Sequence, residues 1–187
     1  MNNSLVLESL AGLLAYPGRE SLRDAEACCD ALEREIAGRV PGSVLESLRK
    51  YRTALGIFSA EELEELYTRT FDLNPVCSLD IGWHLFAENY DRGTFLVEMR
   101  NALKEHGLSE STELPDHLPT VLRLLARMEP DRAKALAGDS VLPAVRTMAK
   151  GFSDSANPYA ALTAIVEPLL MTTLDLESGV PAHDDHR

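Results

Sequence analysis

The sequence predicts an all-α protein, a single-domain bundle of about eight to ten helices. Leucine and alanine are plentiful, whereas aromatic residues make up only 6% of the 187-residue chain. Val, Ile and Thr are sparse and do not alternate, and this mixture favours helices over strands. The chain is long enough to bury a core. We expect one helical domain over residues 1–177 and a polar, disordered tail at 178–187.

Four helices are expected in the first part of the chain. Ser4 can cap the first, which has leucines at helical spacing and ends at the turn 16–18. Two more are expected at about 21–36 and 43–55, with Gly and Pro residues between them. Ser59 and Glu62 have the S-x-x-E spacing of a capping box and open a fourth helix, which Asn74-Pro75 ends. Its inward side chains are expected to be Leu63, Leu66, Tyr67 and Phe71.

The segment 77–86 is apolar and has the length of a strand, but its helical neighbours favour a helix or loop. A helix is expected at about 89–106, with Gly107 just past its end.

The last third of the chain predicts a further helix after His117, which stops near Pro130. Short helices at about 131–137 and 140–150 follow. Asn157 and Pro158 cap and begin a last helix. Pro168 lies inside that helix and should kink it.

Charge and cysteine content limit the class of protein. The net charge of −12 weighs against a nucleic-acid partner and suits a basic peptide or simply solubility. Cys28 and Cys29 are adjacent and Cys77 stands alone, so no disulfide framework is expected. The N-terminus lacks a basic region, and no apolar run reaches membrane-spanning length. We expect a cytoplasmic protein without membrane insertion.

The common signatures of enzymes are missing from the sequence. It has no phosphate-binding glycine loop, no G-x-S-x-G and no H-E-x-x-H. His84 and Glu88, four residues apart, make half a metal site at best, and the histidines at 183 and 186 belong to the polar tail. The sequence therefore predicts no catalytic residues, no cofactor and no metal.

The stretch 113–119, Glu-Leu-Pro-Asp-His-Leu-Pro, has the most constrained backbone in the chain. Its prolines hold Asp116 and His117 at the entrance of a helix. Capping by Asp116 alone would explain this arrangement, but it does not require Glu113 or His117. A small hydrolase using Asp116 and His117 is an alternative, for which no nucleophile or oxyanion device is evident.

An aromatic group completes the candidate site. Each of its members alone is more typical of a core, yet beside the 113–119 loop they could line a groove for an amphipathic peptide helix. The aromatic residues are Tyr67, Phe71, Trp83 and Phe86.

Several motifs in order carry a family resemblance. They are Leu-Leu-Ala-Tyr-Pro at 13–17, Tyr-Thr-Arg-Thr-Phe-Asp at 67–72, Trp-His-Leu-Phe at 83–86, Asp-Arg-Gly at 91–93, and the stretch 113–119. With them the chain resembles the TorD/NarJ family of chaperones for molybdenum enzymes, and is most like the nitrate reductase delta subunit branch. Two departures are Thr70, where relatives often have leucine, and the missing Gly-Asp of the nitrate reductase chaperones, which Ala87-Glu88 or Glu88-Asn89 replaces.

The resemblance implies an all-helical, non-enzymatic chaperone in the cytoplasm. Such a protein binds the N-terminal, leader-like segment of the apo catalytic subunit of a molybdopterin oxidoreductase, and holds it until the molybdenum cofactor is inserted. In relatives whose client carries a twin-arginine leader, it also delays export. The family's Asp-His pair maps to Asp116 and His117, and its Tyr…Phe pattern to Tyr67 and Phe71.

We predict that nine residues bind the client peptide: Glu113, Asp116, His117, Tyr67, Phe71, Trp83, His84, Phe86 and Arg92. A GTP-dependent maturation factor, with phosphates at Arg92 or Arg123, is the main alternative, although no phosphate loop supports it. We expect a monomer; a domain-swapped dimer is plausible if residues 107–118 act as a hinge.

Overall fold

The computed structural model describes residues 1–109, 112–152 and 156–176, without the side chains of residues 19–21. The predicted tail at 178–187 lies outside these residues. The described chain forms ten α-helices and two π-helical segments, so the all-α prediction is confirmed. In order they are α1 (Asn3–Leu13), α2 (Arg19–Ile36), α3 (Gly42–Leu55), α4 (Ala60–Tyr67), η1 (Thr68–Asp72), α5 (Ile81–Phe86), α6 (Asp91–Glu105), α7 (Leu118–Leu125), α8 (Pro130–Leu136), η2 (Ala137–Val141), α9 (Leu142–Lys150) and α10 (Pro158–Thr173).

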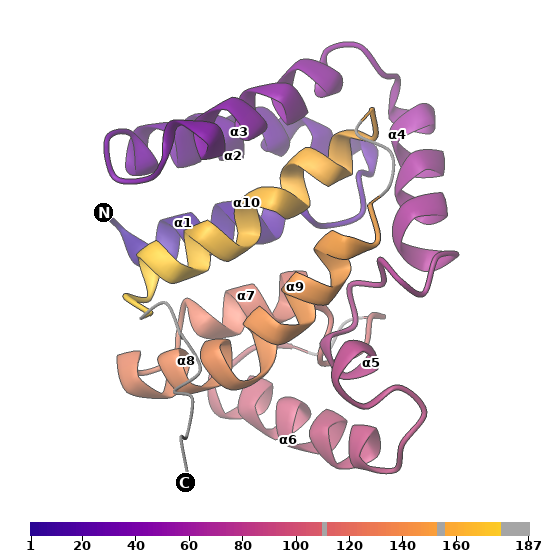
Figure 1. Ribbon diagram of the computed structural model, residues 1–187, viewed down its shortest axis with the longest axis vertical. Helices are drawn as coiled ribbons and strands as arrows, with labels where there is room; N and C mark the ends of the chain where they lie inside the picture. The colour runs from indigo at the N-terminus through magenta and orange to yellow at the C-terminus, as the bar shows by residue number, and fades with distance from the viewer. Residues whose placement is uncertain (110–111, 153–155, 177–187) are drawn as a thin grey trace, which may run out of the picture.

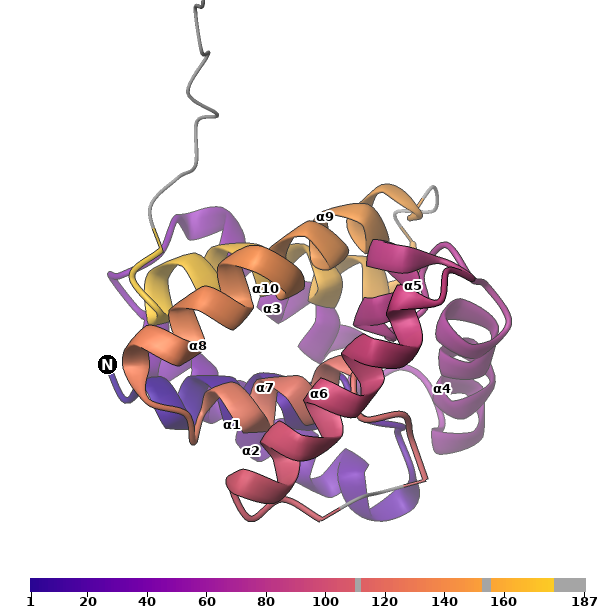
Figure 2. The same cartoon turned by 90° about the horizontal axis from the view of Figure 1, so that it is seen from below.

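The last helix, α10, crosses the middle of the molecule (Figure 1). It packs against α1, α3 and α9, while α1 also packs against α2 and α7. Helix α10 is apolar on several sides and buries a long row of aliphatic side chains, as expected of a central helix. Helices α5 and α6 pack on each other at the far side from α2 and α3 (Figures 1 and 2).

The local signals for helix ends are largely confirmed. The side chain of Ser59 accepts the Glu62 N–H at 3.2 Å, and the Glu62 carboxylate accepts the Ser59 N–H at 2.8 Å. Gly107 follows α6 with a φ of 67°, and the Asn157 side chain accepts the Tyr159 N–H at the start of α10. The predicted cap at Ser4 is wrong, because the helix starts earlier: Asn2, an equally good cap, accepts the Leu5 N–H at 3.1 Å.

Two predicted elements differ in shape. The fourth helix does not continue as an α-helix to Asn74 but changes to the π-helical segment η1, where i→i+5 hydrogen bonds enclose one extra residue and the chain is locally underwound. Residues 130–150 form one continuous run through α8, η2 and α9 instead of two separate helices. The apolar segment 77–86 is a turn followed by the short helix α5, which confirms the prediction of a helix or loop there.

A tight turn joins α5 to α6. The Asn89 N–H donates to the Phe86 carbonyl at 3.0 Å, and Ala87 between them has φ 51° and ψ −126°. These angles are those of the first central residue of a type II′ turn, a position that favours glycine.

Among the described residues, no helix has both the length and the apolar character needed to cross a bilayer.

Candidate functional site

Asp116 ties the 113–119 loop to α5. Its side chain is fully buried, and its Oδ2 accepts the Gly82 N–H at 2.7 Å. The Asp116 carbonyl also accepts the Ile81 N–H at 3.2 Å, and the Leu118 N–H donates to the Leu79 carbonyl at 2.8 Å. Asp116 therefore accepts the free N–H groups at the start of α5 from outside that helix, whose own N-cap residue is Asp80, and it does not cap the helix that follows it.

This finding corrects the simple capping interpretation. The N-cap residue of α7 is His117, whose side chain makes no capping hydrogen bond, although Pro119 does lie in the first turn as predicted. Asp116 instead serves a helix 34 residues away, because the bridge between Asp80 and His117 brings the two chain segments side by side. Gly82 permits this approach, since a Cβ there would lie 2.8 Å from Asp116 Oδ2.

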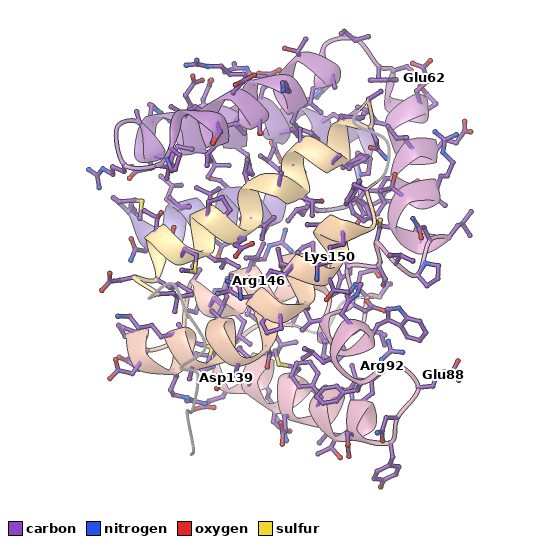
Figure 3. All side chains as sticks on the ribbon, in the orientation of Figure 1. Glu62, Glu88, Arg92, Asp139, Arg146 and Lys150 are labelled. Carbon is purple, nitrogen blue, oxygen red and sulfur yellow. The ribbon has the colours of Figure 1, made fainter. Side chains whose placement is uncertain are left out.

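A small charged cluster lies next to this tie. Arg92, from the start of α6, lies alongside α5 (Figure 3). Its Nη2 is 3.4 Å from Asp80 Oδ2, and its guanidinium carbon is 5.6 Å from the centre of the Trp83 ring. Burial and the neighbouring Asp116 raise the pKa of Asp80 to about 6, although Arg92 opposes this shift.

A hollow of about 180 Å³ opens between this cluster and the end of η1. The indole Nε1–H of Trp83 donates to the Pro75 carbonyl at 2.8 Å, which fixes the ring at the edge of the hollow. Its lining combines aromatic faces with two carboxylates. The lining residues are Phe71, Asp72, Pro75, Ser78, Asp80, Trp83 and Arg92.

The structure places Tyr67 and Phe71 mainly in the core. Each is 3% exposed, and the Tyr67 hydroxyl donates to the Leu14 carbonyl at 3.2 Å. Their rings stack edge-on with each other and with Tyr159. Phe71 lines the hollow, whereas Tyr67 is not among the residues that line it.

Three other predicted site residues, in α5 and on the 113–119 loop, are not among the residues that line the hollow. His84 is half-buried, and its Nε2 lies 2.7 Å from the Ser78 carbonyl, where burial lowers its pKa. Phe86 packs its ring on Phe95, away from Trp83. Glu113 is exposed on the loop.

His117 is half-buried at the start of α7. Burial, with a smaller contribution from the positive charge of Arg123, lowers the pKa of His117 to about 4. The Asp116 carboxylate is engaged with Gly82 rather than with this imidazole, so the pair does not form the acid–base arrangement that a hydrolase would need.

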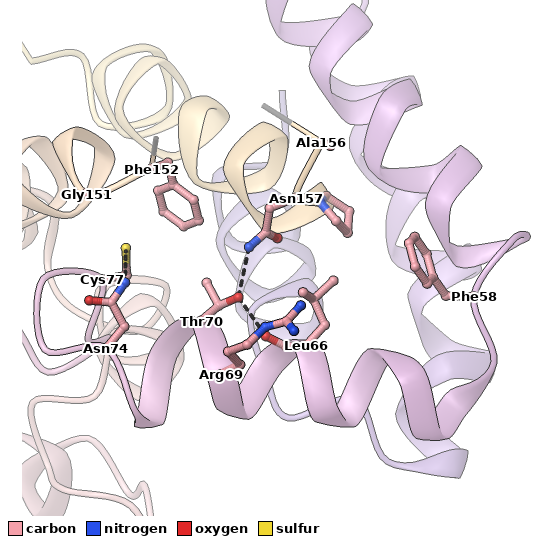
Figure 4. Close-up of a pocket in the computed structure, with 11 residues that line it drawn as sticks. Phe58, Leu66, Arg69, Thr70, Asn74, Cys77, Gly151, Phe152, Ala156 and Asn157 are labelled. Carbon is pink, nitrogen blue, oxygen red and sulfur yellow. Dashed lines mark hydrogen bonds between the residues drawn. The ribbon is translucent and has the colours of Figure 1, made fainter. Parts of the chain in front are cut away.

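A larger cavity, of about 580 Å³, lies on the other side of η1, against the start of α10 (Figure 4). Thr70 bridges its two walls: the Thr70 hydroxyl donates to the Leu66 carbonyl at 2.6 Å and accepts from the Asn157 amide at 2.9 Å. The Thr70 hydroxyl thus links the end of the fourth helix to the start of α10. Arg69 also lines this cavity.

Sequence reasoning missed Asp80, Gly82 and the π-helical form of η1. Asp80 had a local signal, since it immediately precedes an apolar helical stretch, but its partner Arg92 is 12 residues away. The role of Gly82 depends on Asp116 and had no local signal at all. Among the described residues, no group of three or more His, Cys, Asp or Glu side chains is placed to hold a metal ion.

Comparison with known proteins adds to this geometry. Residues 39–164 match the model of the nitrate reductase delta subunit family. The chain is 28% identical over 166 residues, covering 88% of both proteins, to the "Probable nitrate reductase molybdenum cofactor assembly chaperone NarJ" of Bacillus subtilis.

Two further relatives are similar over different shares of their length. The chain is 30% identical over 131 residues to the "Nitrate reductase molybdenum cofactor assembly chaperone NarJ" of Escherichia coli K12, which covers 65% of this chain and 55% of that protein. It is 24% identical over 165 residues to the "Nitrate reductase-like protein NarX" of Mycobacterium tuberculosis, covering 87% of this chain and 24% of that protein. Because the family model matches about two thirds of its length, the chain belongs to the nitrate reductase delta subunit family.

Proposed function

We propose that this protein is an assembly chaperone for a molybdenum-dependent nitrate reductase or a close relative of that enzyme. It binds the N-terminal segment of the apo catalytic subunit and holds the subunit ready for insertion of the molybdenum cofactor. The relatives named as cofactor assembly chaperones support the general role. The chaperone itself performs no catalysis in this proposal.

The observation that carries the peptide-binding part is the hollow beside α5. It places the half-buried ring of Trp83 next to the carboxylates of Asp72 and Asp80, on a protein with a net charge of −12. An aromatic face beside carboxylates suits a peptide helix with one apolar side and basic residues at its edge. Apolar burial would provide most of the affinity, because exposed ion pairs contribute only about 0–1 kcal/mol each.

Among the predicted residues, the structure supports two different roles. Trp83, Phe71 and Arg92 line the hollow and can contact a peptide directly. Asp116 is buried and bonded to Gly82, so its contribution to binding is to hold α5 in place. Tyr67 acts in the same indirect way through η1.

Co-purification from the native host tests the proposal. Tagged protein should capture a large molybdopterin-enzyme subunit, identified by mass spectrometry, and deletion of that subunit's N-terminal segment should abolish the capture. Trp83→Ala should reduce the captured amount at least about tenfold, since a buried aromatic anchor contributes 2 kcal/mol or more. Val97→Ala, which removes a 52% exposed apolar side chain from α6, serves as the control. Equal capture by both variants would refute the location of the site, and capture of no such subunit from a host that makes one would refute the function.

A further inference from the structure

The guanidinium of Arg92 lies where a foreign cation would bind. It faces the Trp83 ring at 5.6 Å and Asp80 Oδ2 at 3.4 Å, on the wall of the 180 Å³ hollow. An aromatic face and a carboxylate at these distances are the two elements of a site for an arginine side chain. The chain thus fills this site with one of its own residues.

We infer that Asp80 and Trp83 form a guanidinium-binding site that Arg92 occupies in the free protein and vacates for an arginine of the bound partner. The inference rests on the proposed function for the identity of the partner, which is a peptide with at least one arginine. Arg92 then competes with the peptide rather than assisting it. This refines the prediction that Arg92 simply binds the client.

The contacts of Arg92 are incomplete, which allows the residue to leave. A charge-assisted hydrogen bond is normally about 2.7–2.9 Å long. The distance from Arg92 Nη2 to Asp80 Oδ2 is longer, at 3.4 Å. The Nε–H of Arg92 is buried and has no hydrogen-bond partner among the described residues. A buried donor without a partner destabilises the arrangement that contains it.

Asp116 offers Arg92 an alternative partner. Its Oδ1 is likewise buried and has no hydrogen-bond partner among the described residues. The two side chains flank the same glycine: the Cβ position of Gly82 is 2.8 Å from Asp116 Oδ2 and 3.4 Å from Arg92 Cγ. A rotation of the guanidinium from Asp80 towards Asp116 would satisfy both unpaired atoms and leave Asp80 and Trp83 to the guest.

The electrostatics of the hollow also favour a second cation. Asp72 and Asp80 both line it, and Asp116 lies nearby, whereas Arg92 is the single basic residue in the lining. The raised pKa of Asp80, about 6, reflects burial and the nearby Asp116. A guest guanidinium would compensate this excess of carboxylates, and its planar shape suits both the indole face and a carboxylate.

The test uses the fluorescence of Trp83, which is the one tryptophan of the chain. Purified full-length protein is titrated with N-acetylarginine methylamide, and with the neutral citrulline analogue, at pH 8 so that Asp80 is ionised. The variant Arg92→Met removes the guanidinium and keeps an unbranched stem for packing. Arg132→Met is the matched control, because Arg132 pairs with Glu105 at 2.8 Å on the exposed side of α6 and its loss changes the net charge equally.

Arg92→Met should bind the arginine probe about tenfold more tightly than the wild type, the combined effect of one ion pair and one cation–π contact. Arg132→Met should bind as the wild type does, and the citrulline analogue should show no gain. Adding Asp80→Asn to Arg92→Met should abolish the gain. Circular dichroism of each variant verifies the fold.

Equal affinities of Arg92→Met and Arg132→Met for the probe would overturn the inference, as would weaker binding by Arg92→Met. The result is independent of the client. A tenfold gain without a captured enzyme subunit would support the guanidinium-binding site and refute the proposed function. A captured subunit without the gain in affinity would support the proposed function and overturn the guanidinium-binding site.

Discussion

Ala87 is the residue with the clearest conformational cost. It adopts the turn position with φ 51° and ψ −126°, which an alanine tolerates poorly because of its Cβ. Strain of this kind costs about 1–3 kcal/mol. A glycine would relieve the strain, but the greater conformational entropy that it gives the unfolded chain would offset part of the gain.

Ala87→Gly should therefore stabilise the protein by about 1 kcal/mol, against the usual effect of adding a glycine. Urea unfolding measured by circular dichroism gives the free energy of unfolding. The control is Ala164→Gly, at an exposed position in the middle of α10. This substitution should destabilise the protein by about the same amount. If both substitutions destabilise the protein, the turn does not carry the strain described.

His117 makes stability depend on pH. Its pKa is lowered to about 4 in the folded state from a usual value near 6.5, so the unfolded chain binds this proton more tightly. The stability that depends on a neutral His117 is complete above pH 6.5 and is lost as the pH falls towards 4, by at most about 3 kcal/mol. Asp80 opposes this trend, because its pKa is raised in the folded state.

The variant His117→Gln isolates the histidine contribution. The difference in free energy of unfolding between variant and wild type should change in favour of the variant as the pH falls from 7 to 4, because only the wild type must keep an imidazole neutral. Denaturant titrations at several pH values measure this difference. A difference that stays constant over the range would contradict the buried, neutral state of His117.

At the scale of the element, α5 depends on a tie from elsewhere in the chain. The helix spans only Ile81–Phe86, so it has little stability of its own. Asp116 accepts the free N–H groups at the start of the helix, and the approach of the carboxylate requires a glycine at position 82.

Gly82→Ala should destabilise the protein by about 1–3 kcal/mol, because the new Cβ would lie 2.8 Å from Asp116 Oδ2 and 3.0 Å from a ring carbon of Phe95. Trp83 emission should also change, since the ring is next to the displaced backbone. Gly93→Ala provides the comparison: it lies in α6 with no atom within 4 Å of its Cβ position, and the substitution should stabilise the helix by up to about 1 kcal/mol. The same outcome for both glycines would exclude a special role for Gly82.

Sequence patterns predicted the elements better than the site. Capping residues such as Ser59, Gly107 and Asn157 act on neighbours a few positions away, so their effects can be read from local sequence. The partner of Asp116 lies 34 residues away and depends on how the two segments pair. The change of α4 into η1 has no composition signal either, and Tyr67 was assigned to a groove although it packs in the core.

At the scale of the whole molecule, charge should govern how fast the client is found. A protein with a net charge of −12 attracts a basic peptide over a distance comparable to the Debye length, which is about 10 Å at 0.1 M salt and 30 Å at 0.01 M. The electrostatic attraction affects encounter more than the lifetime of the complex.

The association rate constant of the client peptide should fall several-fold between 0.01 and 0.15 M salt, and the dissociation rate constant should change much less. Stopped-flow fluorescence with a labelled peptide measures both constants. A peptide with neutral residues in place of its basic ones should associate at a rate that salt does not affect. Dissociation that accelerates as strongly as association slows would contradict the expectation that apolar burial dominates affinity.

The contacts of Asp116 also predict that one segment of the molecule opens as a unit. Residues 80 and 117 pair directly, so the ends of the segment between them, which includes α5 and α6, already lie together. Three amide protons close this segment: those of Ile81, Gly82 and Leu118. We expect them to be released together, because opening the segment separates the two chain segments that the bridge pairs. In hydrogen exchange, these three amides should report one opening free energy, below that of the aliphatic core of α10, and the substitution of Gly82 by alanine should accelerate all three together.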